Sequence, residues 1–335
     1  MQQKKPITYI IGHQKPDTDS VVSAMALEYL YQQANSYGYS EPKAVIADPI
    51  NEETKYLFSR FDLKAPQLLS ALIDSQDQVV LVDHNEASQR SAHFTQEQIV
   101  EIVDHHKVNL NLSKPIYLTF KTWGASSSIV YFLMKQADIT PPKKLAALML
   151  SAILSDTVGL KSPTTTDKDE KFAKELAKIA QVDDLEAFTL DIFKAKSNVS
   201  KLTPTQIVKN DYKLFEFAQP TFIGQIETVE QELLLSTKKQ ELLAAMTQVK
   251  AQEKVEYLFL AITDILKINT KLLILGKPEQ EIAQKAFGGT TQESVLDIGS
   301  KLSRIHAHGR LSFLYSNTVN LVLQESGERV FSGLC

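Results

Sequence analysis

The sequence predicts an α/β protein of two domains, on three observations. In the first half of the chain, short apolar runs rich in β-branched residues alternate with longer helical patterns. This order is typical of a mainly parallel sheet flanked by helices. The length of 335 residues exceeds one small core and favours two domains. Hydrophobic residues at 43% and charged residues at 23% match an average globular protein, which excludes disordered, collagen-like and coiled-coil classes.

The first predicted domain contains five short strands. They are Thr8–Ile11, Ala44–Ala47, Val79–Val82, Ile99–Val103 and Tyr117–Phe120. Helical patterns such as Ser20–Tyr37 and Ser127–Ala137 lie between or after them. Because Val79–Val82 is apolar on both faces, we expect helices on both sides of the sheet. The apolar run Leu145–Leu154 predicts a buried helix, since a bilayer span needs ~20 residues.

A linker and a smaller α/β domain with a mixed sheet are predicted next. Residues 193–204 lose periodicity and are rich in Lys, Ser, Asn, Thr and Pro, as in a linker. We therefore expect a first domain over residues 1–192 and a second over 205–335. The strand and helix patterns of the second domain are Phe222–Ile226, Glu230–Lys254, Tyr257–Ile262 and Leu272–Leu275.

Charge and cysteine content restrict the partners. Lys plus Arg (36) against Asp plus Glu (40) gives a net charge of -4. This charge provides no long-range attraction for nucleic acid or an anionic membrane, so we expect neither partner. The single cysteine, Cys335, excludes a disulfide framework and a Cys-based zinc site. It suits a reducing compartment, and Ile7–Ile11 is too short for a signal peptide, so we expect a cytoplasmic protein.

Polar residues that can bind metal directly follow three predicted strands. They are His13 after Ile11, Asp83-His84-Asn85 after Val82, and Asp104-His105-His106 after Val103. In open α/β sheets, ligands bind at the carboxyl ends of the strands. We therefore expect the three loops to converge on one site.

Two further groups of acidic residues could join this site. Asp17 and Asp19 follow His13 in the same loop, where a histidine and two carboxylates can hold a divalent cation. The alternative is an ordinary loop in which Asp19 or Ser20 caps the next helix. Asp156, after the apolar run, is either a helix-end polar group or a ligand.

The joint occurrence of these residues favours the metal site over separate caps and turns. Their ligand atoms are oxygen and nitrogen, a set that favours Mn²⁺, Mg²⁺ or Co²⁺ over a structural Zn²⁺. A pair of such ions suits attack of water on a phosphorus centre, because the ions activate water and stabilise both attacking and leaving oxygens.

Four blocks stand in a specific order and spacing along the chain. They are G-H-x-x-P-D-T-D-S at Gly12–Ser20, D-H-N at Asp83–Asn85, D-H-H at Asp104–His106 and S-D-T at Ser155–Thr157. Together they resemble family II (manganese-type) inorganic pyrophosphatases of the DHH phosphoesterase superfamily. Further matches are Asn51–Thr54, Lys161–Asp167 and Ile262–Leu266, so the resemblance spans about residues 7–304. D-H-H alone also occurs in RecJ-type nucleases.

The resemblance implies a DHH fold and a dinuclear metal site between the two domains. One implied metal is held by His13, Asp17 and Asp83, and a second by Asp19, Asp83, His105 and Asp156. Asp83 thus bridges two Mn²⁺ (or Co²⁺) ions, and additional Mg²⁺ arrives with substrate. A bridging water or hydroxide is the implied nucleophile that splits pyrophosphate into two orthophosphates.

The resemblance also assigns substrate residues and a partner. His106 matches the substrate-contacting histidine, whereas Asp104 is expected to orient a neighbouring imidazole. Lys213 and Arg304, in the second domain, match the cations that bind the leaving phosphate. A homodimer through the N-terminal domain, by an edge strand of its sheet, is implied as well.

The chain departs from the family pattern after Arg304. The family has a lysine there, whereas this sequence has Ile305, followed by His-Ala-His-Gly-Arg310. One hypothesis is a frameshift near codon 305, which makes residues 305–335 atypical. The alternative is ordinary divergence, in which His306 or Arg310 substitutes for the lysine.

Other functions remain open at this point. One is a different DHH phosphoesterase, which acts on oligonucleotides, phosphoadenosine phosphate or short polyphosphate. Nucleotide-binding relatives commonly carry a Gly-Gly-Gly-His motif, but Phe287–Gly289 lacks the histidine. The other is a catalytically weakened family member that senses pyrophosphate and does not hydrolyse it.

Overall fold

The chain divides into two compact units. The structure is a computed structural model and describes residues 5–34, 37–197, 199, 202–216 and 219–299. The first unit covers Met1–Lys196 and the second begins at Ser197. Helix α6 (Leu185–Ser197) runs into the range 193–204, for which the sequence predicts a linker.

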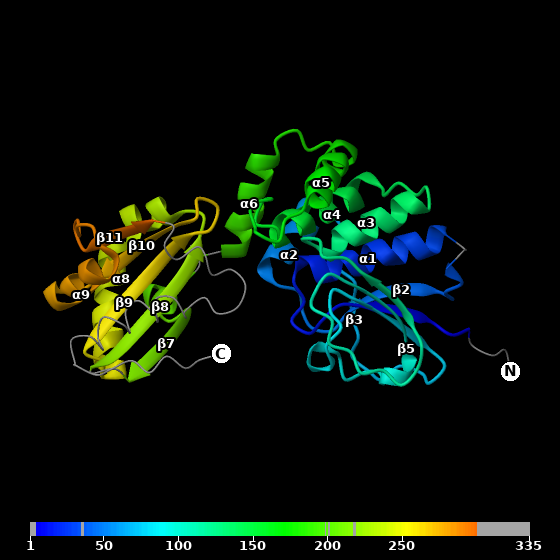
Figure 1. Ribbon diagram of the computed structural model, residues 1–335, viewed down its shortest axis with the longest axis horizontal. Coiled ribbons are helices and arrows are strands. Elements are labelled where there is room, and N and C mark those ends of the chain that lie inside the picture. Colours follow the sequence, from blue (N-terminus) through cyan, green and yellow to red (C-terminus); the bar gives the residue numbers. More distant parts are fainter. Residues whose placement is uncertain (1–4, 35–36, 198, 200–201, 217–218, 300–335) are drawn as a thin grey trace. The chain divides into compact units, whose positions relative to one another are not determined.

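The first unit is built on a six-stranded sheet in which every pairing is parallel (Figure 1). The strand order is β3-β2-β1-β4-β5-β6. This confirms the predicted parallel sheet and adds one short edge strand, β3. The strands are β1 (Thr8–Ile11), β2 (Pro42–Ile46), β3 (Gln67–Leu68), β4 (Gln78–Val82), β5 (Ile99–Asp104) and β6 (Tyr117–Phe120).

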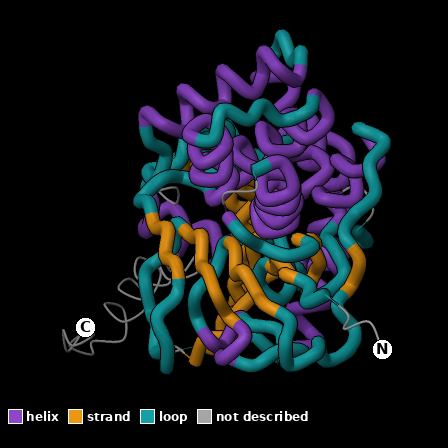
Figure 2. The backbone as a smooth tube through the Cα atoms, turned by 90° about the vertical axis from the view of Figure 1, so that its right-hand side faces the viewer, coloured by secondary structure: helices purple, strands orange, loops and turns teal. Residues whose placement is uncertain are grey.

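Helices cover one face of this sheet, as Figure 2 shows. The other face packs against loops: Ile11 and Val79 lie in a cluster with Leu69, Phe94 and Leu110, and no residue of this cluster lies in a described α-helix. The expectation of helices on both faces is wrong there, because apolar loop residues bury the second face. The other helices of this unit are α1 (Thr18–Gln33), α2 (Glu52–Arg60), α3 (Ser126–Gln136), α4 (Lys143–Asp156) and α5 (Asp167–Ala180).

The second unit contains the predicted mixed sheet, in the order β11-β10-β9-β8-β7. Strands β8 and β9 pair in parallel, and the other neighbours pair antiparallel. Helices α7 and α8 pack on one face and α9 on the other. The elements are α7 (Pro204–Val208), β7 (Asp211–Glu216), β8 (Pro220–Thr228), α8 (Gln231–Glu253), β9 (Tyr257–Asp264), β10 (Asn269–Ile274), α9 (Lys277–Phe287) and β11 (Val295–Gly299).

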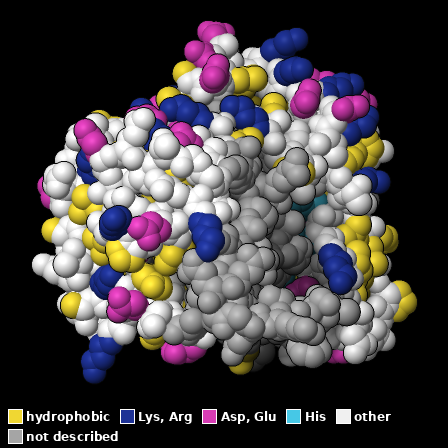
Figure 3. Space-filling view, turned by 60° about the vertical axis from the view of Figure 1, so that its left-hand side comes forward, with side chains coloured by type: hydrophobic (Ala, Val, Ile, Leu, Met, Phe, Trp, Pro, Cys, Tyr) yellow, Lys and Arg dark blue, Asp and Glu magenta, His cyan; other side chains and the backbone are white. Residues whose placement is uncertain are grey.

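The surface and the helices bear on the expected partners. Within the described ranges, no helix is both long and apolar enough to cross a membrane. On the face drawn in Figure 3, Lys and Arg side chains are interspersed with Asp and Glu.

Candidate metal centre

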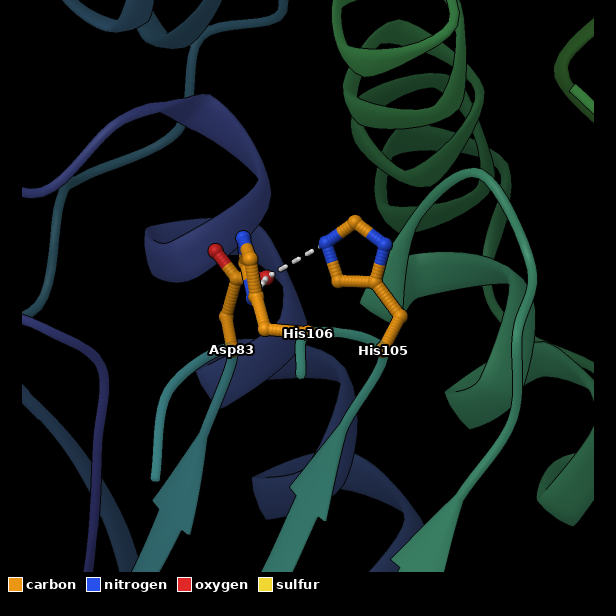
Figure 4. Close-up of side chains that lie close together, drawn as sticks. All are labelled: Asp83, His105 and His106. Carbon is orange, nitrogen blue, oxygen red and sulfur yellow. Dashed lines mark ion pairs between the residues drawn. The ribbon is translucent and has the colours of Figure 1, made fainter. Parts of the chain in front are cut away.

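Three loops meet at one edge of the first sheet. Strands β1, β4 and β5 are neighbours and run parallel, so their carboxyl ends lie side by side. His13 follows β1, Asp83 follows β4, and His105 and His106 follow β5. Figure 4 shows Asp83 with both histidines, and the imidazole of His105 points at the Asp83 carboxylate.

Two groups of possible ligand atoms coincide with the sets that the resemblance implies. In each group, the ligand atoms lie within 4.8 Å of one another, and Asp83 belongs to both. Asp83 also forms a third group with the two histidines of the D-H-H block. The two sets are His13, Asp17 and Asp83, and Asp19, Asp83, His105 and Asp156.

The spacing of these atoms fits ligands that surround an ion. His13 Nε2 lies 3.6 Å from Asp17 Oδ1 and 3.6 Å from Asp83 Oδ2. His105 Nε2 lies 3.3 Å from Asp83 Oδ1 and 3.7 Å from Asp156 Oδ2. Ligand atoms about 2.1 Å from a shared ion are about 3 to 3.7 Å apart for angles of about 90 to 120° at the ion, whereas hydrogen bonds measure about 2.7 to 3.2 Å.

Two buried atoms of the cluster also need a partner. Within the described part of the chain, Asp83 Oδ2 and His105 Nε2 make no hydrogen bond. Buried polar atoms are nearly always satisfied, so each such atom calls for an explanation. A divalent cation in each group of ligand atoms would give each of these two atoms a partner, and the residues therefore fit metal ions.

Negative charge is crowded in the cluster. Considering the protein groups alone, burial raises the pKa of Asp19 to about 7, and the charge of Asp83 contributes to this rise. Burial, with the neighbouring Asp17 and Asp19, also raises the pKa of Asp156 well above its usual value. Burial lowers the pKa of His13, but Asp17 and Asp83 raise it to about 11. A bound divalent cation would neutralise this excess of carboxylate charge.

The loop after β1 is shaped by Gly12 and by the start of α1. A Cβ at Gly12 would lie 1.8 Å from Ser20 Oγ, an oxygen that accepts a hydrogen bond from the His13 N–H. The N-cap of α1 is Asp17, whose Oδ1 accepts from Ser20 N at 3.0 Å. The alternative in which Asp19 or Ser20 caps the helix is therefore wrong.

The first turn of α3 holds two of the carboxylates in place. Ser126 N and Ser127 N donate to the two oxygens of Asp19, at 2.6 and 2.9 Å. The Ser126 hydroxyl donates to Asp83 Oδ1 at 2.9 Å. Sequence reasoning missed these serines, although a run of three small polar residues at the start of a helix was a visible signal.

Asp104 was expected to orient a neighbouring imidazole, and the imidazole that it contacts is that of His106. Asp104 Oδ1 lies 2.9 Å from His106 Nδ1, and Asp104 Oδ2 accepts from Asn85 Nδ2 at 2.7 Å. The hydrogen bond with Asp104 raises the pKa of His106 despite its partial burial. Because Nδ1 of His106 faces Asp104, Nε2 of this half-exposed ring is available to contact a ligand. Asn85 was part of a predicted motif without an assigned role, and it anchors this pair.

For the pyrophosphatase activity that the resemblance implies, we expect Asp104→Asn to lower kcat by about 10- to 100-fold, because partners that orient a reacting or ligating group typically have effects of this size. An amide of the same shape loses the charge that fixes His106, and it places a donor against Asn85. Steady-state kinetics and Mn²⁺ titration check this. An equal loss of Mn²⁺ affinity would show that Asp104 acts on the metal ligands instead.

The two predicted substrate cations are not placed together by the structure. Lys213 lies on β7, an edge strand of the second sheet, with its side chain exposed. Arg304 lies outside the described residues, as do Ile305 and residues 305–335. Their roles, and the frameshift, stay predictions.

Matches to domain families cover both units. Residues 7–153 match the DHH family, N-terminal domain, and residues 190–318 match the DHHA2 domain. The second match continues past Ile305. The parallel sheet, the histidine and aspartate cluster and these matches define a DHH protein with a DHHA2 domain.

Relatives of known name show to which family of DHH proteins the chain belongs. A "Probable manganese-dependent inorganic pyrophosphatase" of Deinococcus radiodurans is 37% identical over 305 residues, which is 88% of this chain and 94% of the relative. One of Lactiplantibacillus plantarum is 36% identical over 297 residues, with the same shares. The crystal structure of a putative family II inorganic pyrophosphatase of Methanococcus jannaschii has a TM-score of 0.59 and 32% identity, covering 93% of this chain and 99% of that chain. The chain belongs to the family of manganese-dependent inorganic pyrophosphatases.

Proposed function

We propose that this chain hydrolyses inorganic pyrophosphate to two orthophosphates at a dinuclear Mn²⁺ (or Co²⁺) site. The observation that carries the proposal is the position of Asp83, which belongs to both groups of ligand atoms and has one oxygen toward each. A carboxylate so placed suits a bridge between two ions. The names of the relatives, which describe manganese-dependent inorganic pyrophosphatases, support the substrate and the metal.

The residues at this site have separate roles in binding the metal ions and the substrate. Two divalent ions, when bound, lower the pKa of a water molecule and stabilise the attacking and leaving oxygens. The backbone N–H groups of Ser126 and Ser127 hold the Asp19 carboxylate, and the Ser126 hydroxyl holds that of Asp83. His106, held by Asp104, donates a hydrogen bond or a proton to the phosphate from its exposed nitrogen.

Charge neutralisation of the substrate is the remaining requirement. Pyrophosphate carries up to four negative charges, so additional Mg²⁺ is proposed to bind with it. On the resemblance, Lys213 and Arg304 bind the leaving phosphate, since an Arg fork and a Lys point charge suit such groups.

A homodimer and a cytoplasmic location complete the proposal. Strand β6 ends the sheet of the first unit, and its Tyr117 and Leu118 are 73% and 52% exposed. An exposed edge strand can pair with a second copy, which supports the dimer that the resemblance implies. A reducing compartment suits the single cysteine, Cys335.

A substrate panel tests the proposal. Phosphate release is measured with Mn²⁺ or Mg²⁺ from pyrophosphate, tripolyphosphate, 3′-phosphoadenosine 5′-phosphate and a dinucleotide. We expect the chain to hydrolyse pyrophosphate faster than the other three substrates. Turnover of the dinucleotide without turnover of pyrophosphate would favour another DHH phosphoesterase, and tight binding of pyrophosphate without release would favour a sensor.

We expect Ile305→Lys to raise kcat/KM for pyrophosphate by about 10- to 100-fold, because a charged contact to a phosphate contributes about 1.5–3 kcal/mol. The substitution restores the lysine that follows Arg304 in the family. Parallel kinetics of both proteins check this. An unchanged kcat/KM would indicate that this position has no role, or that the residues after it are out of frame, which resequencing the gene decides.

A further inference from the structure

A lysine of the first unit lies beside a buried carboxylate that the proposed mechanism does not use. Glu53, on α2, is 2% exposed, and its Oε1 accepts a hydrogen bond from Thr18 Oγ1 at 2.5 Å. Its other oxygen, Oε2, makes no hydrogen bond within the described residues and lies 3.5 Å from Lys196 Nζ. Lys196 is near the end of α6 and its side chain is 46% exposed.

The same ammonium group lies next to the metal centre. Lys196 Nζ donates to Ser155 Oγ at 3.0 Å, and Ser155 precedes the candidate ligand Asp156. Burial lowers the pKa of Lys196, but Glu53, Asp156 and Asp17 outweigh this and raise it. The ammonium is therefore charged and lies in the field of the carboxylate cluster.

The donors of this ammonium group leave room for a ligand. A lysine carries three N–H donors. Glu53 and Ser155 occupy two directions around Nζ, and the half-exposed side chain leaves the third accessible. A flexible stem with a compact charge suits an anion that arrives at the metal centre.

We propose that Lys196 binds a phosphate group of the substrate at the metal centre, with Glu53 and Ser155 holding its ammonium in position. This inference rests on the proposed function, because it takes pyrophosphate as the substrate. It assigns a substrate cation to the first unit, in addition to the cations that the resemblance places in the second. The competing role is purely structural, in which Lys196 only neutralises buried Glu53.

The test compares Lys196→Met, Lys196→Arg and the control Lys144→Met. Lys144 is 51% exposed and lies 3.2 Å from Asp62 Oδ2, so the control removes a similar ion pair elsewhere in the same unit. Calorimetry measures the Kd of Mn²⁺-loaded protein for methylenediphosphonate, an analogue that is not hydrolysed. Steady-state kinetics separately measure KM and kcat for pyrophosphate.

For Lys196→Met we expect the Kd of the analogue and the KM to rise about 10- to 100-fold, with kcat lowered much less. Lys196→Arg should recover most of the binding, and Lys144→Met should bind like the unchanged chain. Metal-free Lys196→Met should also bind Mn²⁺ a few-fold more tightly, since a repelling charge is gone.

A lower melting temperature with unchanged Kd and KM would overturn the inference and leave Lys196 a structural role. If the Met variant unfolds, Lys196→Gln provides the same test, because it keeps a polar hydrogen-bond donor without the charge. Failure of the proposed pyrophosphatase function would give a different result. The unchanged chain would then release no phosphate from pyrophosphate, while binding of the analogue would still depend on Lys196.

Discussion

Replacing Asp83 with Asn is expected to lower kcat/KM for pyrophosphate by about a thousandfold or more, equivalent to about 4 kcal/mol of transition-state stabilisation. Asp83 is the residue shared by both groups of ligand atoms, so its loss weakens both proposed metal sites together. It has a positive φ of 63°, a conformation that asparagine tolerates. The substitution therefore changes the charge and leaves the backbone in place.

The matched control is Asp77→Asn. Asp77 is also buried in the first unit, but its oxygens accept from the backbone N–H groups of Ile7 and Asp74. We expect this variant to be less stable and to keep its Mn²⁺ affinity. Equal losses of activity in both variants, with Mn²⁺ binding intact in Asp83→Asn, would contradict a bridging role.

Removal of divalent metal is expected to abolish activity and to lower the melting temperature of the first unit. Binding of an ion at a hundred times its Kd adds about 2.7 kcal/mol to the stability. For a domain of this size each kcal/mol shifts the melting temperature by about 2–4 °C, so two ions give about 10–20 °C. The melting temperature shifts because the buried carboxylates of Asp19, Asp83 and Asp156 repel one another and a bound cation relieves this repulsion.

Differential scanning fluorimetry after chelation and after addition of Mn²⁺ measures this shift. The Asp83→Asn variant is the comparison, because its melting temperature should respond much less to Mn²⁺. A melting temperature that Mn²⁺ leaves unchanged would contradict a buried metal centre. Activity that survives chelation would contradict the proposed chemistry.

The sequence predicted the sheet of the first unit well, because buried parallel strands are continuous apolar runs. Two strands that it missed lack such a pattern. Strand β3 has two residues, both exposed, and β7 is exposed along nearly its whole length. The prediction of helices on both sheet faces was wrong, because an apolar residue such as Val79 indicates only that its face of the sheet is buried. It does not indicate whether a helix or a loop covers that face.

The candidate site followed from the sequence for a different reason. Ligand-type residues directly after parallel strands must meet at one sheet edge, so His13, Asp83 and His105 could be brought together without coordinates. The supporting groups could not be found in this way. Lys196 contacts Ser155 through the packing of α6 against the end of α4, which leaves no local pattern in the sequence. The serine run that begins with Ser126 marks the start of a helix, but it does not show that the helix reaches Asp83.

The most direct test of a two-metal pyrophosphatase is a titration of metal-free protein with Mn²⁺ while orthophosphate release from a known amount of pyrophosphate is followed by a colorimetric phosphate assay. We expect two orthophosphates for each pyrophosphate, with the rate rising until two Mn²⁺ ions are bound per chain. A rate that reaches its maximum at one ion per chain, or phosphate release without added metal, would contradict it.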